Sequence, residues 1–257
     1  MSKNILVTGS SGLIGGIILK NNSKNNLFGL DVAPSLYPNH EISDISNSKK
    51  LENIFLKNNI EVVVHLAGKT SVNGTWNELI GNNFDGTANI FEASKNSGVD
   101  KVIFASSNHA VGLFENDNPY KQIISGNYED VKAYDLIKSN CELRPDSLYG
   151  VSKAFGENIG RYYYETFGLK TACLRIGSVR PVDTPIEGNF NRFFSTWCSH
   201  KDISGLIEAC INSEKIGFNI FYGVSDNKWK IWDISDQQEL LNFQPESNAE
   251  IYRKQNS

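Results

Sequence analysis

The chain has 257 residues, of which 40% are hydrophobic and 21% charged, a composition that fits a water-soluble globular protein. A net charge of −4 and a pI near 5.6 argue against nucleic acid or a membrane surface as a partner, and no apolar stretch is long enough to span a bilayer. The four cysteines are scattered and the four histidines lack ligand spacing, which argues against disulfides and a metal site. The first residues run directly into a strand rather than a signal peptide, so we expect a cytoplasmic protein.

The amino-terminal segment predicts a strand, a glycine-rich turn and a helix. Residues 5–7 are apolar, residues 8–15 read TGSSGLIG, and apolar residues then continue at helical spacing. Gly9 permits the tight turn, Gly12 lets a pyrophosphate approach the backbone, and Gly15 lets helix and strand pack closely. The start of such a helix favours phosphate through its free N–H groups. The glycine spacing differs by one position from the commonest dinucleotide fingerprint, so an ordinary glycine-rich turn is the alternative.

A second short strand over residues 27–30 is followed by Asp31. A carboxylate at this place accepts hydrogen bonds from both ribose hydroxyls of an adenosine and repels a 2′-phosphate. No arginine follows Asp31 directly. These features predict NAD rather than NADP as the cofactor.

Apolar runs and amphipathic stretches alternate along the rest of the chain. The apolar runs predict further strands at residues 61–66, 101–105, 171–176 and 219–222. The amphipathic stretches predict helices at about 48–58, 77–97, 149–167 and 201–213, with a possible short helix near 129–139. Repeated strand–helix–strand order predicts an α/β fold with a doubly wound parallel sheet, a Rossmann fold, in one domain over residues 1–257. We expect the less regular segments 113–143 and 178–257 to cap the carboxyl edge of the sheet, where ligands bind.

Tyr149 and Lys153 stand four residues apart, which is one turn of the predicted helix, so their side chains point to the same side. A free phenol has a pKa of about 10 and is a poor base at neutral pH. A fixed ammonium one turn away favours the phenolate, and lowering the pKa to about 7 takes roughly 4 kcal/mol of preferential stabilisation of the anion. A bound nicotinamide cation shares that task. The pair predicts a proton-transfer device beside a nicotinamide, and a solvated helix face is the alternative.

Together these features resemble the extended short-chain dehydrogenase/reductase superfamily. The matching strings are TGSSGLIG at 8–15, Asp31, Asp44-Ile45, His65-Leu66-Ala67-Gly68, Asn83, Ser106-Ser107 and YGVSK at 149–153. The resemblance implies that Ser107, Tyr149 and Lys153 form the catalytic group. It implies a cofactor site made of Gly9, Ser11, Gly12, Leu13, Ile14, Gly15, Asp31, Asp44, Ile45, Leu66, Ala67, Gly68, Asn83, Tyr149, Lys153 and Ile176.

A narrower resemblance is to uronate dehydrogenases. The strings that carry it are SSNHAVG at 106–112, RPDSLYGVSKAFGE at 144–157, LRIGS at 174–178 and RFFSTWCSHKD at 192–202. The resemblance implies NAD-dependent oxidation of the anomeric carbon of a hexuronic acid, galacturonate or glucuronate in type, to an aldarolactone. It implies a substrate site made of Ser71, Ser107, Asn108, His109, Tyr149, Ser178 and Arg192.

The residue types of that substrate site suit an acidic sugar. Arg192 can clamp a carboxylate with two parallel hydrogen bonds, while Asn108 and His109 can read hydroxyl positions. The alternatives are that Arg192 is a surface residue paired with Glu187 and that His109 only packs at a strand end.

Two features bear on the identity of the substrate. The link from Leu113 to Leu143 is longer than in relatives of the uronate type, and Lys69 near Ser71 adds a cation near the expected sugar site. A sugar-nucleotide epimerase or dehydratase of the same superfamily, and a non-catalytic NAD-binding regulatory protein, remain alternative functions. The expected partner is a small-molecule acidic sugar, and the three consecutive tyrosines at 162–164 are consistent with a helix surface at the interface of a homo-oligomer.

Overall fold

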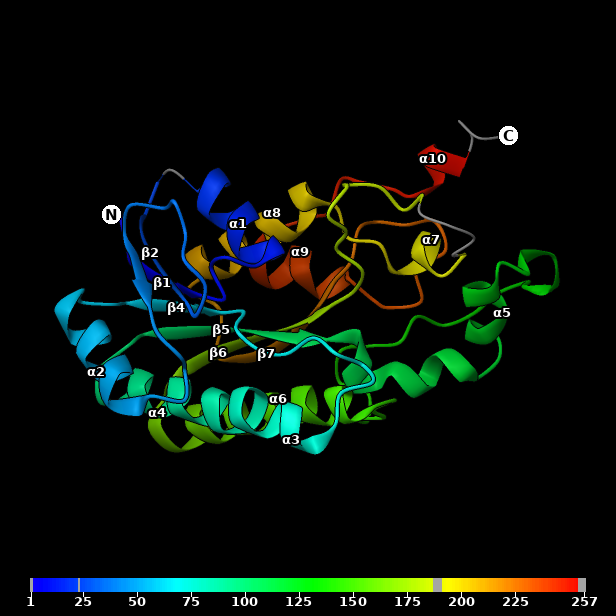
Figure 1. Cartoon of the computed structure of the whole chain (residues 1–257). Coiled ribbons are helices and arrows are strands. Elements are labelled where there is room, and N and C mark those ends of the chain that lie inside the picture. Colours follow the sequence, from blue (N-terminus) through cyan, green and yellow to red (C-terminus); the bar gives the residue numbers. More distant parts are fainter. Residues whose placement is uncertain (1, 23, 187–190, 254–257) are drawn as a thin grey trace.

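A parallel sheet of seven strands forms the centre of the computed structural model, which describes residues 2–22, 24–186 and 191–253 (Figure 1). The order across the sheet is β3-β2-β1-β4-β5-β6-β7, with a crossover between β1 and β4. The strands are β1 (Asn4–Thr8), β2 (Asn26–Asp31), β3 (His40–Ile42), β4 (Val62–His65), β5 (Lys101–Ser107), β6 (Lys170–Ile176) and β7 (Phe218–Gly223). This order confirms the predicted doubly wound sheet. The strand order reverses between β1 and β4, and such folds bind ligands beside this point, at the carboxyl ends of the strands.

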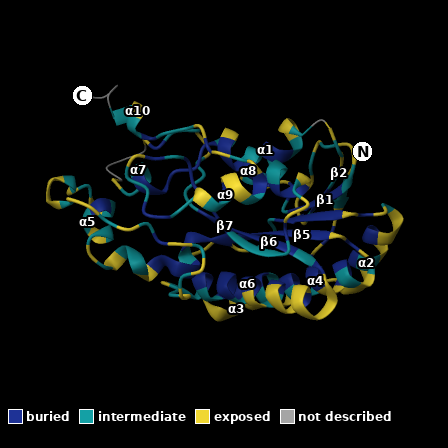
Figure 2. Cartoon of the chain, turned by 180° about the vertical axis from the view of Figure 1, so that it is seen from behind, coloured by how far each residue is buried: buried dark blue, intermediate teal, exposed yellow. Residues whose placement is uncertain are grey.

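Helices cover both faces of the sheet, and each face has its own apolar core. On one face lie α1 (Leu13–Asn21), α8 (His200–Asn212) and α9 (Ser235–Leu241), and on the other α2 (Ser48–Lys57), α4 (Thr87–Asn96) and α6 (Leu148–Phe167) (Figure 1). Figure 2 shows the strands buried between helices whose outer faces are exposed. This burial on both faces explains why the strands read as continuous apolar runs rather than as alternating ones.

The remaining elements are short. They are α3 (Trp76–Leu79), a π-helical turn (Ile80–Gly86) that leads into α4, a 3₁₀ helix (Asn108–Asn116), α5 (Tyr120–Ser125), a 3₁₀ turn (Tyr128–Asp130), α7 (Phe193–Thr196) and α10 (Glu250–Arg253). None of the helices in the described part of the chain has the length and apolar character needed to cross a membrane.

Two predictions about local structure differ from the fold. The short helix expected near 129–139 is wrong: after the 3₁₀ turn the chain is irregular, and Ile137 pairs with Trp232 instead. The Ile137 N–H donates to the Ile231 carbonyl at 2.8 Å, so a partner distant in sequence satisfies the backbone there. The strand β3 was not expected from the sequence, because it is three residues long and has no fully buried side chain.

The segment 113–143 contributes to a third apolar core. Val111, Ile123 and Ile137 pack there with Tyr222, Val224, Ile231 and Trp232 from β7 and the chain that follows it. Two segments that are far apart in the sequence therefore build one layer beyond the carboxyl end of β5–β7.

Candidate active site

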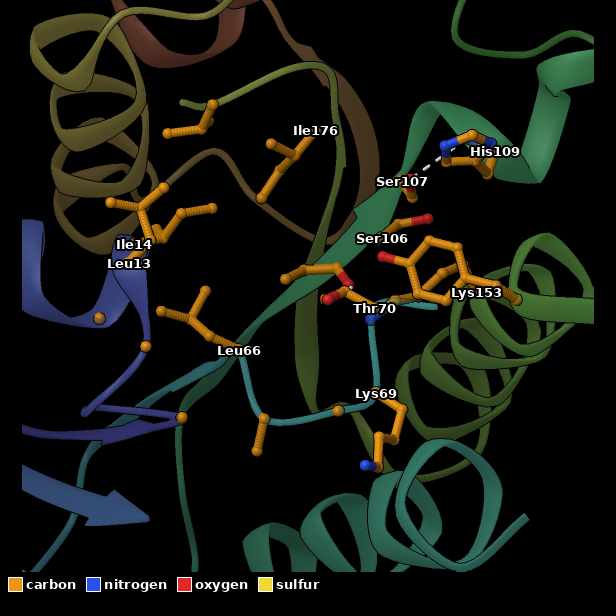
Figure 3. A pocket seen from close by; sticks show the side chains of 18 of the residues that line it. Leu13, Ile14, Leu66, Lys69, Thr70, Ser106, Ser107, His109, Lys153 and Ile176 are labelled. Carbon is orange, nitrogen blue, oxygen red and sulfur yellow. Dashed lines mark hydrogen bonds between the residues drawn. The ribbon is translucent and has the colours of Figure 1, made fainter. Parts of the chain in front are cut away.

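The carboxyl ends of the strands open into a cleft of about 820 Å³ (Figure 3). Figure 3 shows apolar Leu13, Ile14 and Leu66 on one side of the cleft and polar Ser107 and His109 on the other. Of the predicted cofactor and substrate residues, the following line it: Gly9, Gly12, Leu13, Ile14, Gly15, Asp31, Ile45, Leu66, Ala67, Gly68, Ser107, Asn108, His109, Tyr149, Lys153, Ile176, Ser178 and Arg192. The fold thus brings most of the predicted site together, although these residues span the chain from 9 to 192.

The glycine turn at the start of α1 leaves no room for a side chain at Gly9 or Gly15. Gly9 has φ +70°, and a Cβ on it would lie 2.7 Å from the Ala67 nitrogen. A Cβ on Gly15 would lie 2.4 Å from the Gly9 carbonyl oxygen, so helix and strand pack in direct backbone contact. Gly12 is the residue before α1 and offers no side-chain cap, so the first N–H groups of the helix are available to a ligand. This turn fits the pyrophosphate of a dinucleotide.

Asp31 at the end of β2 is held in place by backbone donors. Its carboxylate accepts hydrogen bonds from the Ser11 N–H and the Ala33 N–H, both at 3.0 Å. Val32 and Ile45 line the same cleft with apolar side chains. Ser11 itself does not line the cleft, and its backbone orients Asp31 instead.

Two further predicted cofactor residues lie outside the cleft wall. The Asp44 carboxylate accepts from the Ser46 N–H at 2.8 Å. Asn83 is buried in the π-helical turn, where its side chain bonds both the N–H and the carbonyl of Lys69 and donates to the Ser152 hydroxyl at 2.9 Å. Asn83 therefore joins the loop after β4 to α6, and its neighbour Asn82 lines the cleft.

The predicted catalytic side chains come from β5 and α6. Ser107 ends β5, and Tyr149 and Lys153 lie in the first two turns of α6, which the Ser147 hydroxyl caps by accepting from the Gly150 N–H. A Cβ on Gly150 would lie 2.2 Å from the His109 carbonyl oxygen, so only glycine lets α6 approach the 3₁₀ helix after β5 this closely. The Lys153 Nζ lies 5.6 Å from the centre of the Tyr149 ring and donates to the Ala105 carbonyl at 2.8 Å.

Burial dominates the proton affinities of this group. Burial raises the pKa of Tyr149, and a hydrogen bond with Ser107 opposes part of that rise. Burial also lowers the pKa of Lys153 to about 8. The expectation that Lys153 holds the Tyr149 pKa below its usual value is therefore not met, because the cost of burying the phenolate exceeds the stabilisation that this arrangement provides.

His109 lies beside the phenol and is oriented by a carboxylate. Its ring Nδ1 is 2.7 Å from an Asp146 carboxylate oxygen, and its ring lies edge-on to the Tyr149 ring at 5.7 Å between centres. The hydrogen bond from His109 holds the pKa of Asp146 below its usual value even though burial opposes this. The pattern RPD before the YGVSK string contained Asp146, but no feature of the sequence linked it to His109.

Arg192 lines the cleft, and its guanidinium is bound to a carboxylate of the same chain. Its Nε and Nη2 donate to the two oxygens of Glu115, each at 2.7 Å, and Nη1 lies 3.4 Å from the Ser178 hydroxyl. Glu187, the partner considered from the sequence, lies outside the described residues. Glu115 belongs to the 113–143 segment, and sequence reasoning missed it because nothing local connects residues 115 and 192.

Ser71 and Lys69, both expected near the substrate, differ in where they lie relative to the cleft. Ser71 is exposed and does not line the cleft, whereas its neighbours Thr70 and Val72 do. Lys69 lines the cleft, but its side chain points away from Ser107 and His109 (Figure 3).

Buried polar side chains support the site from behind. Arg175 on β6 donates two hydrogen bonds to Glu157 on α6, each at 2.9 Å, and the Ser106 hydroxyl donates to the same carboxylate at 2.6 Å. His65 is buried between the Thr8 and Thr87 hydroxyls, and burial together with the nearby Lys153 charge lowers its pKa to about 3. His65 is therefore neutral at physiological pH and joins β4 to β1 and α4.

Comparison with known proteins gives consistent matches along the chain. The model of the NAD dependent epimerase/dehydratase family matches residues 5–180. An NAD-dependent glucose-6-phosphate dehydrogenase from Haloferax volcanii is 31% identical over 97% of this chain and 95% of its own length. A uronate dehydrogenase from Pseudomonas syringae pv. tomato is 30% identical over 97% of this chain and 84% of its own length. The structure of a mutant uronate dehydrogenase from Agrobacterium tumefaciens, complexed with NAD, matches with a TM-score of 0.80 and 30% identity over 99% of this chain and 89% of that one.

Proposed function

Because this chain belongs to the NAD-dependent epimerase/dehydratase family and is an NAD-dependent sugar dehydrogenase of the extended short-chain type, we propose that its substrate is a hexuronic acid. The proposed reaction oxidises the anomeric carbon of a galacturonate- or glucuronate-type sugar to an aldarolactone. The observation that carries the proposal is the convergence of Ser107, Tyr149 and Arg192 on one end of a cleft whose other end fits a dinucleotide.

Three side chains supply the proton chemistry in this proposal. NAD, when bound, accepts the hydride from the anomeric carbon. The Tyr149 oxygen takes the proton of the anomeric hydroxyl, and the Ser107 hydroxyl holds the same oxygen. Lys153 keeps a positive charge one turn below the phenol, where it favours the phenolate over the neutral phenol.

Polar groups around the phenol recognise the rest of the sugar. Arg192 is the cation for the carboxylate, and Asn108, His109 and Ser178 read hydroxyl positions. With Nδ1 facing Asp146, the His109 Nε2 is free of that bond and can accept from a sugar hydroxyl. These roles, like the cofactor contacts assigned above, are part of the proposal.

A panel of sugars with both nicotinamide cofactors tests the proposal. We expect NADH to accumulate with free galacturonate or glucuronate, with lower kcat/KM for galactose and glucose and for every sugar with NADP in place of NAD. Tyr149→Phe removes the proton acceptor and should reduce kcat by a factor of about 10² or more, with a smaller effect on KM.

Each alternative predicts a different result in the same assay. Turnover of a UDP-sugar without net NADH would indicate an epimerase or dehydratase. Activity with glucose 6-phosphate but not with uronates would reassign the substrate within the sugar dehydrogenases. NAD binding without turnover of any sugar would favour the regulatory protein.

A further inference from the structure

Glu115 connects two residues of the proposed substrate site without lining the cleft itself. Its Oε1 accepts from the Arg192 Nη2 at 2.7 Å and from the Asn108 Nδ2 at 3.2 Å, and its Oε2 accepts from the Arg192 Nε at 2.7 Å. The Glu115 side chain is only 13% exposed. A carboxylate in such a place is stabilised by the donors around it, and it fixes their orientation in return.

The turn that carries Glu115 is itself fixed. Glu115 lies in the 3₁₀ helix (Asn108–Asn116), and the Leu113 N–H donates to the Arg144 carbonyl at 3.0 Å. The Arg144 guanidinium lies 4.5 Å over the Phe114 ring and forms an ion pair with Asp117. Contacts on both sides of residue 115 therefore limit how far its carboxylate can move.

The geometry of the Arg192 guanidinium leaves one edge for a ligand. Glu115 occupies the edge formed by Nε and Nη2, while among the described residues Nη1 has only the Ser178 hydroxyl at 3.4 Å. A guanidinium carries five N–H groups, so the Nη1/Nη2 edge keeps donors for a second carboxylate. Arg192 and Ser178 line the cleft and Glu115 does not, which places this second edge on the side of the cleft.

We propose that Glu115 is a positioning residue that holds Arg192 by its Nε edge, so that the Nη1/Nη2 edge faces the carboxylate of the sugar. The inference rests on the proposed function. Through Asn108, the same carboxylate orients the amide oxygen, which lies 3.4 Å from the Ser107 hydroxyl. One side chain of the 113–143 segment thus sets the orientation of two substrate-recognition residues and reaches the catalytic serine through one of them.

A Glu115 that competed with the substrate for Arg192 would change KM in the opposite direction. If Glu115 occupied the place of the substrate carboxylate, neutralising it would release Arg192 and lower KM for a uronate. If Glu115 orients Arg192, neutralising it raises KM, because Arg192 then adopts several conformations that the substrate must select among.

Glu115→Gln tests the inference, because it keeps the side-chain shape but removes one acceptor and the charge. We expect KM for galacturonate to rise by about tenfold, the factor typical of one lost charge-assisted hydrogen bond, with kcat within about twofold. Glu129→Gln is the matched control, since Glu129 is an exposed carboxylate of the same segment, and its KM should stay unchanged. An unchanged or lower KM in Glu115→Gln overturns the inference.

A double-mutant cycle separates positioning from a general structural effect. In the Arg192→Ala background, adding Glu115→Gln should raise KM for galacturonate by less than about twofold, because Arg192, through which Glu115 acts on the carboxylate of the sugar, is gone. An equal tenfold rise in both backgrounds overturns the inference.

Hydrogen exchange of the Arg192 side chain tests whether Glu115 holds it, without turnover of any substrate. In the intact protein the NMR signal of the Arg192 Nε–H should exchange slowly with water, and Glu115→Gln should make it exchange rapidly. Arg161, whose side chain is 55% exposed, is the internal reference. If Arg192 exchanges as fast as Arg161 in the wild type, the positioning role is wrong whichever sugar is oxidised. If the signal behaves as expected but no uronate is oxidised, the proposed substrate alone is wrong.

Discussion

The Lys153 amine donates to the Ala105 carbonyl rather than to the phenol one turn away, and both side chains are almost fully buried. At the scale of single residues, burial raises the pKa of Tyr149 and lowers that of Lys153 to about 8, so Lys153 is the first of the two groups to lose its proton as the pH rises. The catalytically useful form of the singly deprotonated pair is an ammonium beside a phenolate. The population of this ammonium–phenolate form rises in proportion to the population of the pair that has lost one proton.

These two burial shifts predict the pH dependence of sugar oxidation. Below the first pKa of the pair both groups are protonated, so kcat/KM should rise about tenfold per pH unit and level off near pH 8. In Lys153→Met only the phenol can lose a proton, and burial raises its pKa above 10. The rising limb should then extend past pH 9, with a loss of at least about 100-fold at pH 7.

Initial rates of NADH formation from pH 5.5 to 10 measure both profiles. The reverse reaction needs the protonated phenol, so lactone reduction should fall with rising pH in the wild type. A Lys153→Met profile that levels off at the wild-type pH would show that another group sets it.

At the scale of secondary-structure elements, glycines on α6 set how closely that helix approaches the sheet. A Cβ on Gly156 would lie 2.1 Å from the Phe104 Cζ on β5, and one on Gly160 would lie 2.8 Å from the Thr171 Cγ2 on β6. The side chains of Tyr149 and Lys153 reach the end of β5 only because their helix lies this close. Packing of α6 and the geometry of the site are therefore linked.

This close packing predicts that one added methyl group on α6 lowers the stability of the protein. Gly156→Ala should lower the free energy of unfolding by about 1–3 kcal/mol through overpacking, despite the better helix propensity of alanine. Gly16→Ala in α1 is the control, because a Cβ there meets no atom within 4 Å and should leave stability unchanged or higher. Urea unfolding followed by circular dichroism measures both, and equal midpoints for the two variants would refute the packing argument.

At the scale of the whole molecule, three apolar cores meet around the sheet. Two of them lie under the helices on its faces, and the third joins the 113–143 segment to the chain after β7. Trp232 is fully buried in the third core and its ring stacks on Tyr222 with 5.7 Å between centres. Since the segment 113–143 also carries Glu115, this core supports the sugar end of the cleft from outside.

Trp232→Ala should therefore destabilise the segment and the substrate site together. We expect the free energy of unfolding to fall by about 3–5 kcal/mol and trypsin cleavage within 113–143 to accelerate. Trp76→Ala is the control, because Trp76 is 48% exposed and its loss should cost about 1 kcal/mol or less. Unchanged cleavage of the segment in Trp232→Ala would mean that the third core does not hold it.

Local patterns in the sequence determined most of the strands of this fold and its long helices. Apolar runs gave six of the seven strands, and TGSSGLIG with Asp31 predicted a dinucleotide turn, because these signals act between residues close together in the chain. The spacing of Tyr149 and Lys153 was sufficient to place both side chains on one side of α6. The three-residue β3 gave no such signal because its side chains are not fully buried.

Only the tertiary structure decided which side chains contact one another in the cleft. Three contacts of the site join residues that are 14 to 77 positions apart in the chain. They are the bonds of Glu115 with Arg192, of Asp146 with His109, and of Asn83 with Lys69 in the loop after β4. The same holds for the proton affinities, because the burial that raises the pKa of Tyr149 and lowers that of Lys153 is produced by the packing of α6 against β5. Residue spacing along a helix fixes direction, whereas ion pairing and desolvation depend on distances through space that the chain sets only when it is folded.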